Sequence, residues 1–210
     1  MSSARAKRYQ FVCGTGRSGS KALRYLLMLQ PDTIMLHNGC PLPWNGNGVG
    51  EASAALIAKL AGYPKGRVGD VAPWYLPHVP SLVGKLFAKV VCLRRPKDET
   101  VASLMRQPVD HFSLVPEFGS EPTAEDRPLL PKYPGNRLEA TSAYYDAYYA
   151  AADALVLDFP SSFMVFPVSS LDTAEGQQAI LDFLEYPRVR QRLGQAQPGS
   201  TRYSCRLFAE

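Results

Sequence analysis

Residues 11–27 read FVCGTGRSGSKALRYLL, and the pattern of this stretch decides the class of fold. Aromatic and β-branched residues in 9–13 predict a short buried strand that ends at a glycine. Leucines at helical spacing then predict a helix that ends before Pro31. A strand, a glycine-rich turn and a helix in this order are typical of an α/β domain that binds its ligand at the turn.

The turn between the predicted strand and the predicted helix has the composition of an anion-binding loop. Glycines permit unusual backbone dihedral angles and a close approach of the backbone to a ligand. The turn contains three of them, Gly14, Gly16 and Gly19. It would direct several backbone N–H groups to one point at the positive end of the helix dipole. Arg17 adds a positive charge, and Ser18 and Ser20 add hydroxyl donors, so the loop is predicted to hold a phosphate or a similar anion.

Two common nucleotide-binding motifs fit this loop only in part. Gly14 and Gly19 have the spacing of the G-x-x-x-x-G-K-[ST] phosphate loop. The residues that follow are Ser20, Lys21 and Ala22, so the hydroxyl that would hold Mg²⁺ after the lysine is missing. The dinucleotide pattern G-x-G-x-x-G also matches, but the region about 20 residues further on reads TIMLHN and supplies no acidic strand end. Neither Mg²⁺–ATP nor NAD is therefore favoured.

Further strands and helices alternate along the rest of the chain. The predicted strands are 33–37, 89–93 and 163–168, with a short segment at 67–71, and the predicted helices are 51–63, 82–87, 98–105, 138–157 and 173–184. This order predicts an α/β fold of three layers with a mostly parallel central sheet, built as one domain over residues 1–210. Within it, residues 107–137 are predicted to form a proline-rich insertion or lid.

Positive charge is concentrated in the first half of the chain. Residues 1–110 carry 15 Lys and Arg against 6 Asp and Glu, whereas residues 111–210 carry 8 against 13. The basic half suits an anionic ligand. Without a long Lys/Arg cluster or a recognition module, the chain is not expected to bind nucleic acid.

The sequence also limits the expected compartment. No apolar run approaches the roughly 20 residues that cross a bilayer, and the first residues lack the apolar stretch of a secretory signal, so no membrane association is expected. The four cysteines show no zinc-binding spacing, and Cys13 and Cys92 lie in strand-like runs where a buried, reduced thiol is expected. These features favour a cytoplasmic protein without a bound metal.

A second candidate anion site follows the predicted strand 89–93. Residues 88–106 read AKVVCLRRPKDETVASLMR, which places Arg94 and Arg95 directly after the strand and Ser103 on the next helix. The carboxyl ends of parallel strands meet at one edge of a sheet, where ligands bind. Arginine suits a phosphate, because its planar guanidinium gives two parallel charged hydrogen bonds. A ligand with two separated phosphate groups would bridge this segment and the glycine loop.

Both segments resemble those of the sulfotransferase family. Residues 14–27 are similar to the family's 5′-phosphosulfate loop, G-x-x-R-S-G-[TS]-[TS] before a leucine-rich helix. Residues 88–106 are similar to its 3′-phosphate segment, a strand that ends in Leu-Arg-x-Pro with a serine on the following helix. Arg95 has the family's eight-residue step to Ser103, whereas Arg94 fits the Leu-Arg-x-Pro register, so one of the two is the expected phosphate ligand.

Two further segments resemble the family more weakly. Residues 68–79, VGDVAPWYLPHV, are similar to the family stretch G-[ED]-K-[ST]-P-x-Y, but Val71 stands in place of the lysine. Residues 163–187 are similar to the closing strand and helix. The matches cover most of the chain, and Val71 removes any cationic role from that position.

This resemblance implies a phosphate-loop sulfotransferase. The enzymes of this family transfer a sulfuryl group from 3′-phosphoadenosine 5′-phosphosulfate (PAPS) to a hydroxyl or an amine, in line and without a metal. The implied donor-binding residues are Gly16, Arg17, Ser18, Gly19, Ser20, Lys21, Arg94, Arg95 and Ser103. Arg17 and Lys21 are the implied catalytic cations, because they would stabilise the charge that builds on the leaving oxygen.

The acceptor needs a base that takes its proton. His37 is the candidate, because it ends the second predicted strand, near the place where some family members carry a glutamate base. Its ordinary pKa of about 6.5 also suits proton transfer near neutral pH. Asp70, Glu51 and His111 are the alternatives.

The partner is expected to be a small-molecule or carbohydrate acceptor. Residues 38–50, which include Trp44, and the proline-rich segment are candidate walls for the acceptor site. Four tyrosines at helical spacing are expected to pack in the core rather than to stack on a ligand. They are Tyr144, Tyr145, Tyr148 and Tyr149.

Two other functions stay open at this point. A nucleotide kinase of the phosphate-loop class would need Mg²⁺–ATP, and the missing Lys-Ser/Thr pair after Gly19 counts against it. A catalytically inactive nucleotide-binding module would keep the anion site and transfer nothing. The short chain and Val71 are compatible with that reading.

Overall fold

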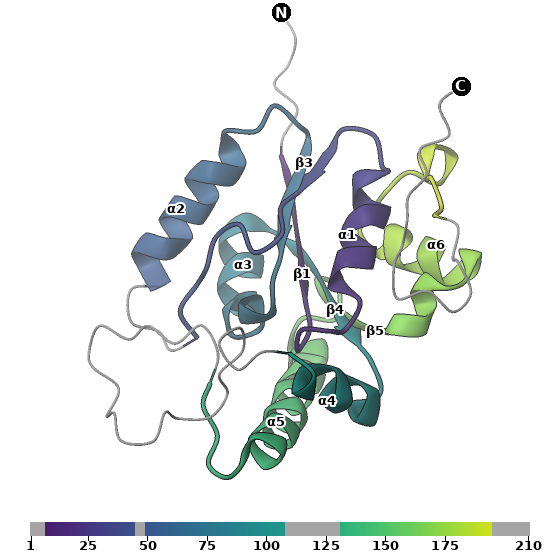
Figure 1. Ribbon diagram of the computed structural model, residues 1–210. Helices are drawn as coiled ribbons and strands as arrows, with labels where there is room; N and C mark the ends of the chain where they lie inside the picture. Colours follow the sequence, from purple (N-terminus) through teal and green to yellow (C-terminus); the bar gives the residue numbers. More distant parts are fainter. Residues whose placement is uncertain (1–6, 45–48, 108–130, 195–210) are drawn as a thin grey trace, which may run out of the picture.

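The computed structural model describes residues 7–44, 49–107 and 131–194, and its five strands form one parallel sheet (Figure 1). The order across the sheet is β2-β3-β1-β4-β5. The strands are β1 (Arg8–Cys13), β2 (Thr33–Met35), β3 (Arg67–Val71), β4 (Lys89–Arg94) and β5 (Phe163–Pro167). Because β1 lies in the centre, the glycine turn that follows it emerges at the middle of the sheet's carboxyl edge.

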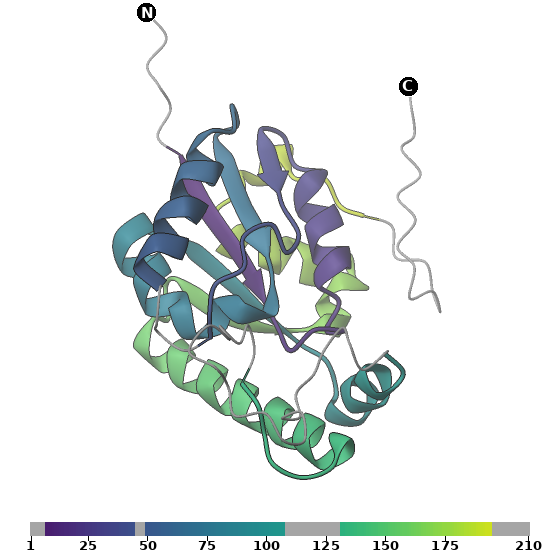
Figure 2. The same cartoon turned by 60° about the vertical axis from the view of Figure 1, so that its left-hand side comes forward.

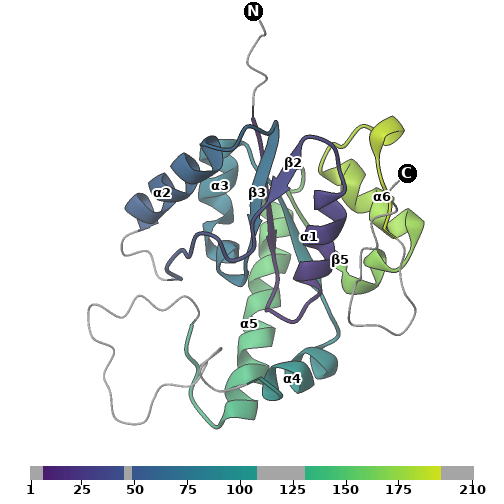
Figure 3. The same ribbon diagram turned by 45° about the horizontal axis from the view of Figure 1, so that its top comes forward.

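Helices cover both faces of the sheet and make the predicted three-layer α/β fold, which is confirmed (Figures 1 and 3). One face carries α1 (Ser20–Met28) and α6 (Ala174–Phe183), and the other carries α2 (Val49–Ala61), α3 (Val79–Leu86) and α5 (Arg137–Asp158). Beyond the carboxyl edge, α4 (Lys97–Met105) follows β4 and packs against α5 (Figure 2). Three short 3₁₀ helices, η1 (Pro73–His78), η3 (Val168–Leu171) and η4 (Arg188–Arg190), complete the described elements.

The strands are held between two apolar cores because their side chains alternate between the faces. On β1, Phe11 and Cys13 pack into the core beneath α2, α3 and α5, whereas Val12 packs into the core beneath α1 and α6. All three side chains are buried. The continuous apolar run of β1 is therefore explained by burial on both faces, as expected for a central parallel strand.

The local sequence explains where the longest helix begins. Asn136 accepts hydrogen bonds from the backbone N–H groups of Leu138 and Glu139, while the Glu139 carboxylate accepts one from the N–H of Asn136. This reciprocal capping satisfies backbone donors that a helix start leaves without partners. It fixes α5, whose tyrosines reach the carboxyl edge of the sheet.

Two predicted boundaries differ from the structure in ways that bear on the site. The edge strand β2 covers only Thr33–Met35 of the predicted 33–37, although the N–H groups of Leu36 and Asn38 still donate to the Gly69 and Val71 carbonyls of β3. Leu36 and His37 therefore belong to the loop beyond the strand. Of the predicted insertion over 107–137, residues 108–130 lie outside the described residues. Among the described helices, none is long and apolar enough to cross a membrane.

Candidate functional site

The loop between β1 and α1 has the backbone conformation that its glycines were expected to permit. Gly14, Gly16 and Gly19 have φ angles of 152°, 80° and 91°. Arg17 also has a positive φ, at 56°. Positive φ angles clustered in a turn before a helix are typical of anion-binding loops, and within this loop the Gly16 N–H donates to the Gly14 carbonyl at 2.8 Å.

Steric crowding also requires a glycine at two of these positions. A Cβ atom on Gly14 would lie 2.3 Å from Ser18 Oγ and 2.9 Å from the Leu93 carbonyl oxygen. A Cβ atom on Gly19 would lie 2.6 Å from Cγ2 of Val168, in η3. The loop is therefore folded tightly onto the ends of β4 and β5, and a side chain at either position would force it open.

Several donors of the loop are available to a ligand. The first hydrogen bond of α1 runs from Leu23 N–H to the Gly19 carbonyl, so helix geometry leaves the N–H groups of the preceding first turn without helical partners. Ser18 is fully buried, and its hydroxyl has no hydrogen-bond partner among the described residues. A buried hydroxyl without a partner costs free energy unless a ligand or water completes it.

The structure brings the two predicted anion-binding segments together. Arg17 Nε donates a hydrogen bond of 3.0 Å to Ser103 Oγ, on α4. Arg95 Nη1 donates one of 3.3 Å to the carbonyl oxygen of Arg17, and Arg95 Nε also pairs with Glu99 at 2.8 Å. The glycine loop and the start of α4 therefore form one continuous rim, with three of the predicted residues in direct contact.

Arg94 faces a different element. Its guanidinium pairs with Asp153 on α5, donates a hydrogen bond to the Tyr149 carbonyl and lies 4.7 Å above the centre of the Tyr149 ring. Sequence alone left Arg94 and Arg95 equivalent as phosphate ligands. The structure separates them, because Arg94 is tied to α5 and Arg95 lies against the glycine loop.

Tyrosines of α5 hold the loop ends through their hydroxyl groups, a role that the sequence analysis missed. Gly14 N–H donates to Tyr148 Oη at 2.9 Å, and the same hydroxyl donates to the Pro73 carbonyl at 2.8 Å. Tyr149 and Tyr145 donate to the carbonyl oxygens of Leu93 and Arg95, each at 2.7 Å. The expected packing role is also present, since these tyrosines are at most 9% exposed.

A hollow of about 370 Å³ lies beside the loop, between α1 and the stretch that follows β2. Its lining residues are Lys21, Arg24, Tyr25, Leu36, His37 and Gly39. The candidate catalytic residues Lys21 and His37 thus face the same space. Arg24 and Tyr25 had not been singled out from the sequence, although residues three and four positions after Lys21 lie on its side of a helix.

The surroundings of His37 favour its neutral form. Burial lowers the pKa of the imidazole below its ordinary 6.5, and the positive charges of Lys21 and Arg24 lower it further, while the Asp70 carboxylate acts in the opposite direction. A neutral imidazole is the form that accepts a proton. The electrostatics are therefore those of a base at neutral pH.

Asp70, one of the alternative bases, is a buried anchor. Its carboxylate accepts hydrogen bonds from the N–H groups of Gly39, Cys40 and Val71 and from the hydroxyl of Tyr75, at 2.7–3.2 Å. Burial raises the pKa of Asp70, and these hydrogen bonds oppose the rise. With four donors in place, the carboxylate fixes the loop after β2, and thereby His37.

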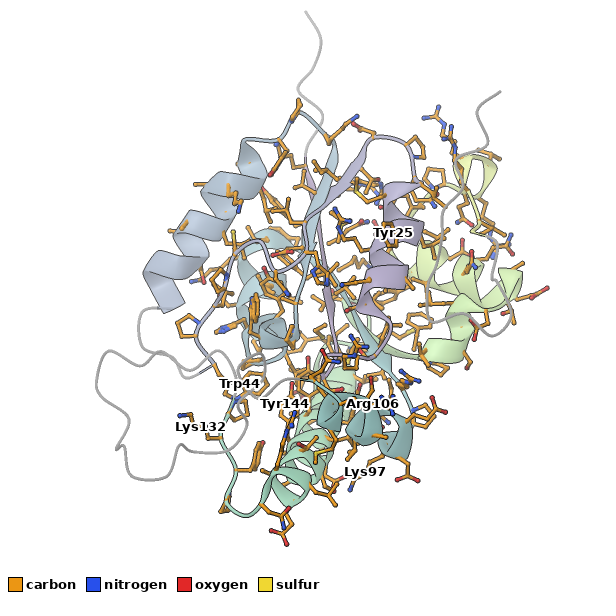
Figure 4. All side chains as sticks on the ribbon, in the orientation of Figure 1. Tyr25, Trp44, Lys97, Arg106, Lys132 and Tyr144 are labelled. Carbon is orange, nitrogen blue, oxygen red and sulfur yellow. The ribbon has the colours of Figure 1, made fainter. Side chains whose placement is uncertain are left out.

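The remaining candidate positions contribute less. The Glu51 side chain and all of His111 lie outside the described residues. Val71 is fully buried at the end of β3, so this position belongs to the core and carries no cation. Trp44, a candidate acceptor wall, packs 5.9 Å from the ring of Tyr148. Figure 4 shows Trp44 near Tyr144 on the side of α5, away from Tyr25 on α1. Within the described ranges, no three His, Cys, Asp or Glu residues are grouped so as to hold a metal ion.

Known proteins resemble this chain in structure only. No family model and no curated protein sequence matches it. A sulfotransferase from Alicyclobacillus acidocaldarius aligns at a TM-score of 0.52 and 17% identity, over 87% of this chain and 82% of the other. Mouse sulfotransferase SULT7A1 complexed with PAP aligns at a TM-score of 0.47 and 16% identity, over 86% of this chain and 60% of the other. Shikimate kinase from Bacteroides thetaiotaomicron aligns at a TM-score of 0.46 and 12% identity, over 85% of this chain and 99% of the other. The first of these likenesses shows the fold, and the chain thus has a phosphate-loop fold of the sulfotransferase type.

Proposed function

We propose that the chain is a sulfotransferase that uses PAPS as donor and a small molecule or carbohydrate as acceptor, without a metal. The observation that carries the proposal is the contact of Arg17 with Ser103, beside Arg95. It joins an anion-binding loop to a second basic segment at the carboxyl edge of the sheet, where ligands of such folds bind. A donor with two separate phosphate groups matches that rim better than a ligand with one phosphate chain.

Each end of the donor has a set of residues suited to it. The 5′ end would lie in the loop, against Arg17, Lys21, the hydroxyls of Ser18 and Ser20 and the N–H groups at the start of α1, whereas the Gly16 N–H already donates to the Gly14 carbonyl at 2.8 Å. The first-turn N–H groups, which have no helical partners, and the buried Ser18 hydroxyl support this assignment. The 3′-phosphate would be held by Arg95 and Ser103, whereas Arg94 ties the end of β4 to α5 through Asp153.

In the proposed reaction the acceptor oxygen or nitrogen attacks the sulfur while the bond from sulfur to the 5′-phosphate oxygen breaks. The electron pair of that bond leaves with the phosphate, where Arg17 and Lys21 stabilise the growing negative charge. The acceptor's proton passes to the neutral imidazole of His37. The shared hollow of Lys21 and His37 supports this division of roles, because it places the proton acceptor beside a cation of the donor site.

The buried side chain of Ala22 counts against a nucleotide kinase. A phosphate loop that uses Mg²⁺ places a Ser or Thr hydroxyl directly after its lysine. Here that position is Ala22, which is 7% exposed and packs in the core beneath α1. The free, buried thiols of Cys13 and Cys92 are compatible with the proposed cytoplasmic location.

The proposal is tested by nucleotide binding in the presence of EDTA. The product 3′-phosphoadenosine 5′-phosphate (PAP) should raise the melting temperature, and a ligand at 100 times its Kd adds about 2.7 kcal/mol of stability. AMP, which lacks the 3′-phosphate, is the matched ligand and should bind at least about tenfold more weakly, because it loses a charged hydrogen bond. Absence of a shift with PAP, or a requirement for Mg²⁺ and ATP, would show the proposed donor to be wrong. PAP binding without transfer to a broad acceptor panel would indicate the inactive module.

A further inference from the structure

We infer that the hollow beside His37 takes an acceptor that is itself an anion, with a carboxylate, phosphate or sulfate group close to the hydroxyl or amine that is modified. This inference rests on the proposed function, since it names the charge of the second substrate. The hollow carries two cations, Lys21 and Arg24, and none of its described lining residues is acidic.

Within the described ranges, the two cations lack the ion pairs that neutralise some of the other basic residues. Arg8, Lys89, Arg94, Arg95, Lys97 and Arg188 each pair with a carboxylate. No carboxylate in the described ranges pairs with Lys21 or Arg24. Arg24 uses its Nε to donate to the Met35 carbonyl at 2.8 Å, which fixes the side chain at the end of β2 and leaves the two terminal nitrogens for another acceptor of hydrogen bonds.

Binding of the donor does not explain the presence of Arg24 in the hollow. Its 5′ end would engage Arg17 and Lys21, which adjoin the glycine turn. Arg24 lies one helical turn further from that turn, on the wall of the hollow that faces His37. A third positive charge beyond the donor-binding set would repel a cationic acceptor and attract an anionic one. A guanidinium also suits the planar, two-oxygen geometry of a carboxylate or phosphate.

The other lining residues of the hollow are partly apolar, so they fit an acceptor that has an apolar portion. The Tyr25 ring is 42% exposed, and the Arg24 guanidinium lies 5.9 Å from its centre. Leu36 closes the other side of the hollow. A volume of about 370 Å³ fits one ring with its substituents, within the usual range for small-molecule sites. Together these residues fit an acidic sugar or an aromatic acid.

The test uses two ligands of nearly the same size and shape, the anion benzoate and the neutral amide benzamide, on the full chain with excess PAP added. Binding is followed by the ring resonances of His37, which are resolvable because the chain has three histidines. Benzoate should bind at least about tenfold more tightly than benzamide, as expected for a charged hydrogen bond. Arg24→Gln should remove that preference, whereas Arg24→Lys should keep part of it. Lys85→Gln, which removes an exposed charge from α3 on the other face, is the control and should keep all of it.

Equal affinity for the two ligands, including no shift with either up to its solubility, would overturn the inference. A preference that survives Arg24→Gln would overturn it as well. PAP binding is measured in the same samples, so the two claims fail separately. If the protein binds PAP but shows no preference for benzoate, only the proposed anionic acceptor is wrong. If it prefers benzoate but does not bind PAP, only the proposed donor is wrong.

Discussion

Arg94 and Arg95 are adjacent in the chain, yet they make different contacts in the structure. Arg95 lies against the loop carbonyl of Arg17, while Arg94 is tied to Asp153 and Tyr149 on α5. We therefore expect Arg95→Ala to weaken PAP binding about tenfold with little change in melting temperature. Arg94→Ala should instead lower the melting temperature and leave PAP affinity nearly unchanged. Calorimetric titration and thermal unfolding of both variants measure this, and the reverse pattern would exchange the two assignments.

His37 gives a prediction about pH. Its folded-state pKa is lowered from 6.5, so the imidazole is neutral at pH 7 and becomes charged only as the pH falls below 6.5. Sulfuryl transfer should then be flat above neutrality and decline on the acidic side. Lys21→Gln removes a positive charge and should raise the pKa of His37 in an NMR titration, whereas the remote Lys85→Gln should not move it. A His37 that titrates above 6.5 in the unaltered protein would contradict the assigned base.

At the scale of one element, α5 holds two tyrosines whose hydroxyls are in opposite situations. Tyr148 Oη bridges Gly14 N–H and the Pro73 carbonyl, while Tyr144 Oη is buried and has no partner among the described residues. Tyr148→Phe should cost about 1–3 kcal/mol of unfolding free energy, because it leaves two buried backbone groups unpaired. It should also weaken PAP binding by loosening the loop.

Tyr144→Phe is the matched control, four residues away on the same helix. Removing a buried hydroxyl that has no partner should leave the stability unchanged or raise it. Urea unfolding of both variants gives the comparison. Equal losses for the two would mean that the hydroxyl of Tyr148 contributes nothing specific to the loop.

For the whole molecule, the sequence was sufficient for the features that depend on local pattern. Glycine spacing predicted the turn, and apolar strands alternating with helices predicted the parallel sheet. Together they implied that the glycine loop and the segment after residues 89–93 share an edge. The contact of Arg17 with Ser103 agrees with that placement.

Other features depend on contacts that no local pattern reveals. The hydroxyl of Tyr148 caps Gly14 across 134 residues of sequence, and the tyrosines alone indicated only packing. The choice between Arg94 and Arg95 depends on the path of α5. The place of Arg24 in the hollow depends on β2 ending at Met35, so that Leu36 and His37 turn toward α1. Each of these three arrangements results from tertiary packing between segments that are distant in the sequence.

The two ends of the sheet should respond differently to the donor. The amino end is closed by internal contacts: Tyr186 Oη donates to Gln10 at 2.7 Å and lies 3.1 Å from Thr33 Oγ1, and Arg67 donates to the Leu184 carbonyl at 2.9 Å. At the carboxyl end, the buried Ser18 hydroxyl has no partner among the described residues, and the first-turn N–H groups of α1 have no helical partners.

Hydrogen exchange with and without PAP measures this difference directly. A ligand that binds only the folded state and satisfies the rim should slow exchange in residues 14–22 and 94–104, because those N–H groups gain partners or lose local opening. Residues 30–34 and 184–190, at the amino end, should change little beyond the general stabilisation. Protection confined to 14–22 would mean that the ligand is held by the loop alone, and the two-phosphate geometry on which the proposed donor rests would then be wrong.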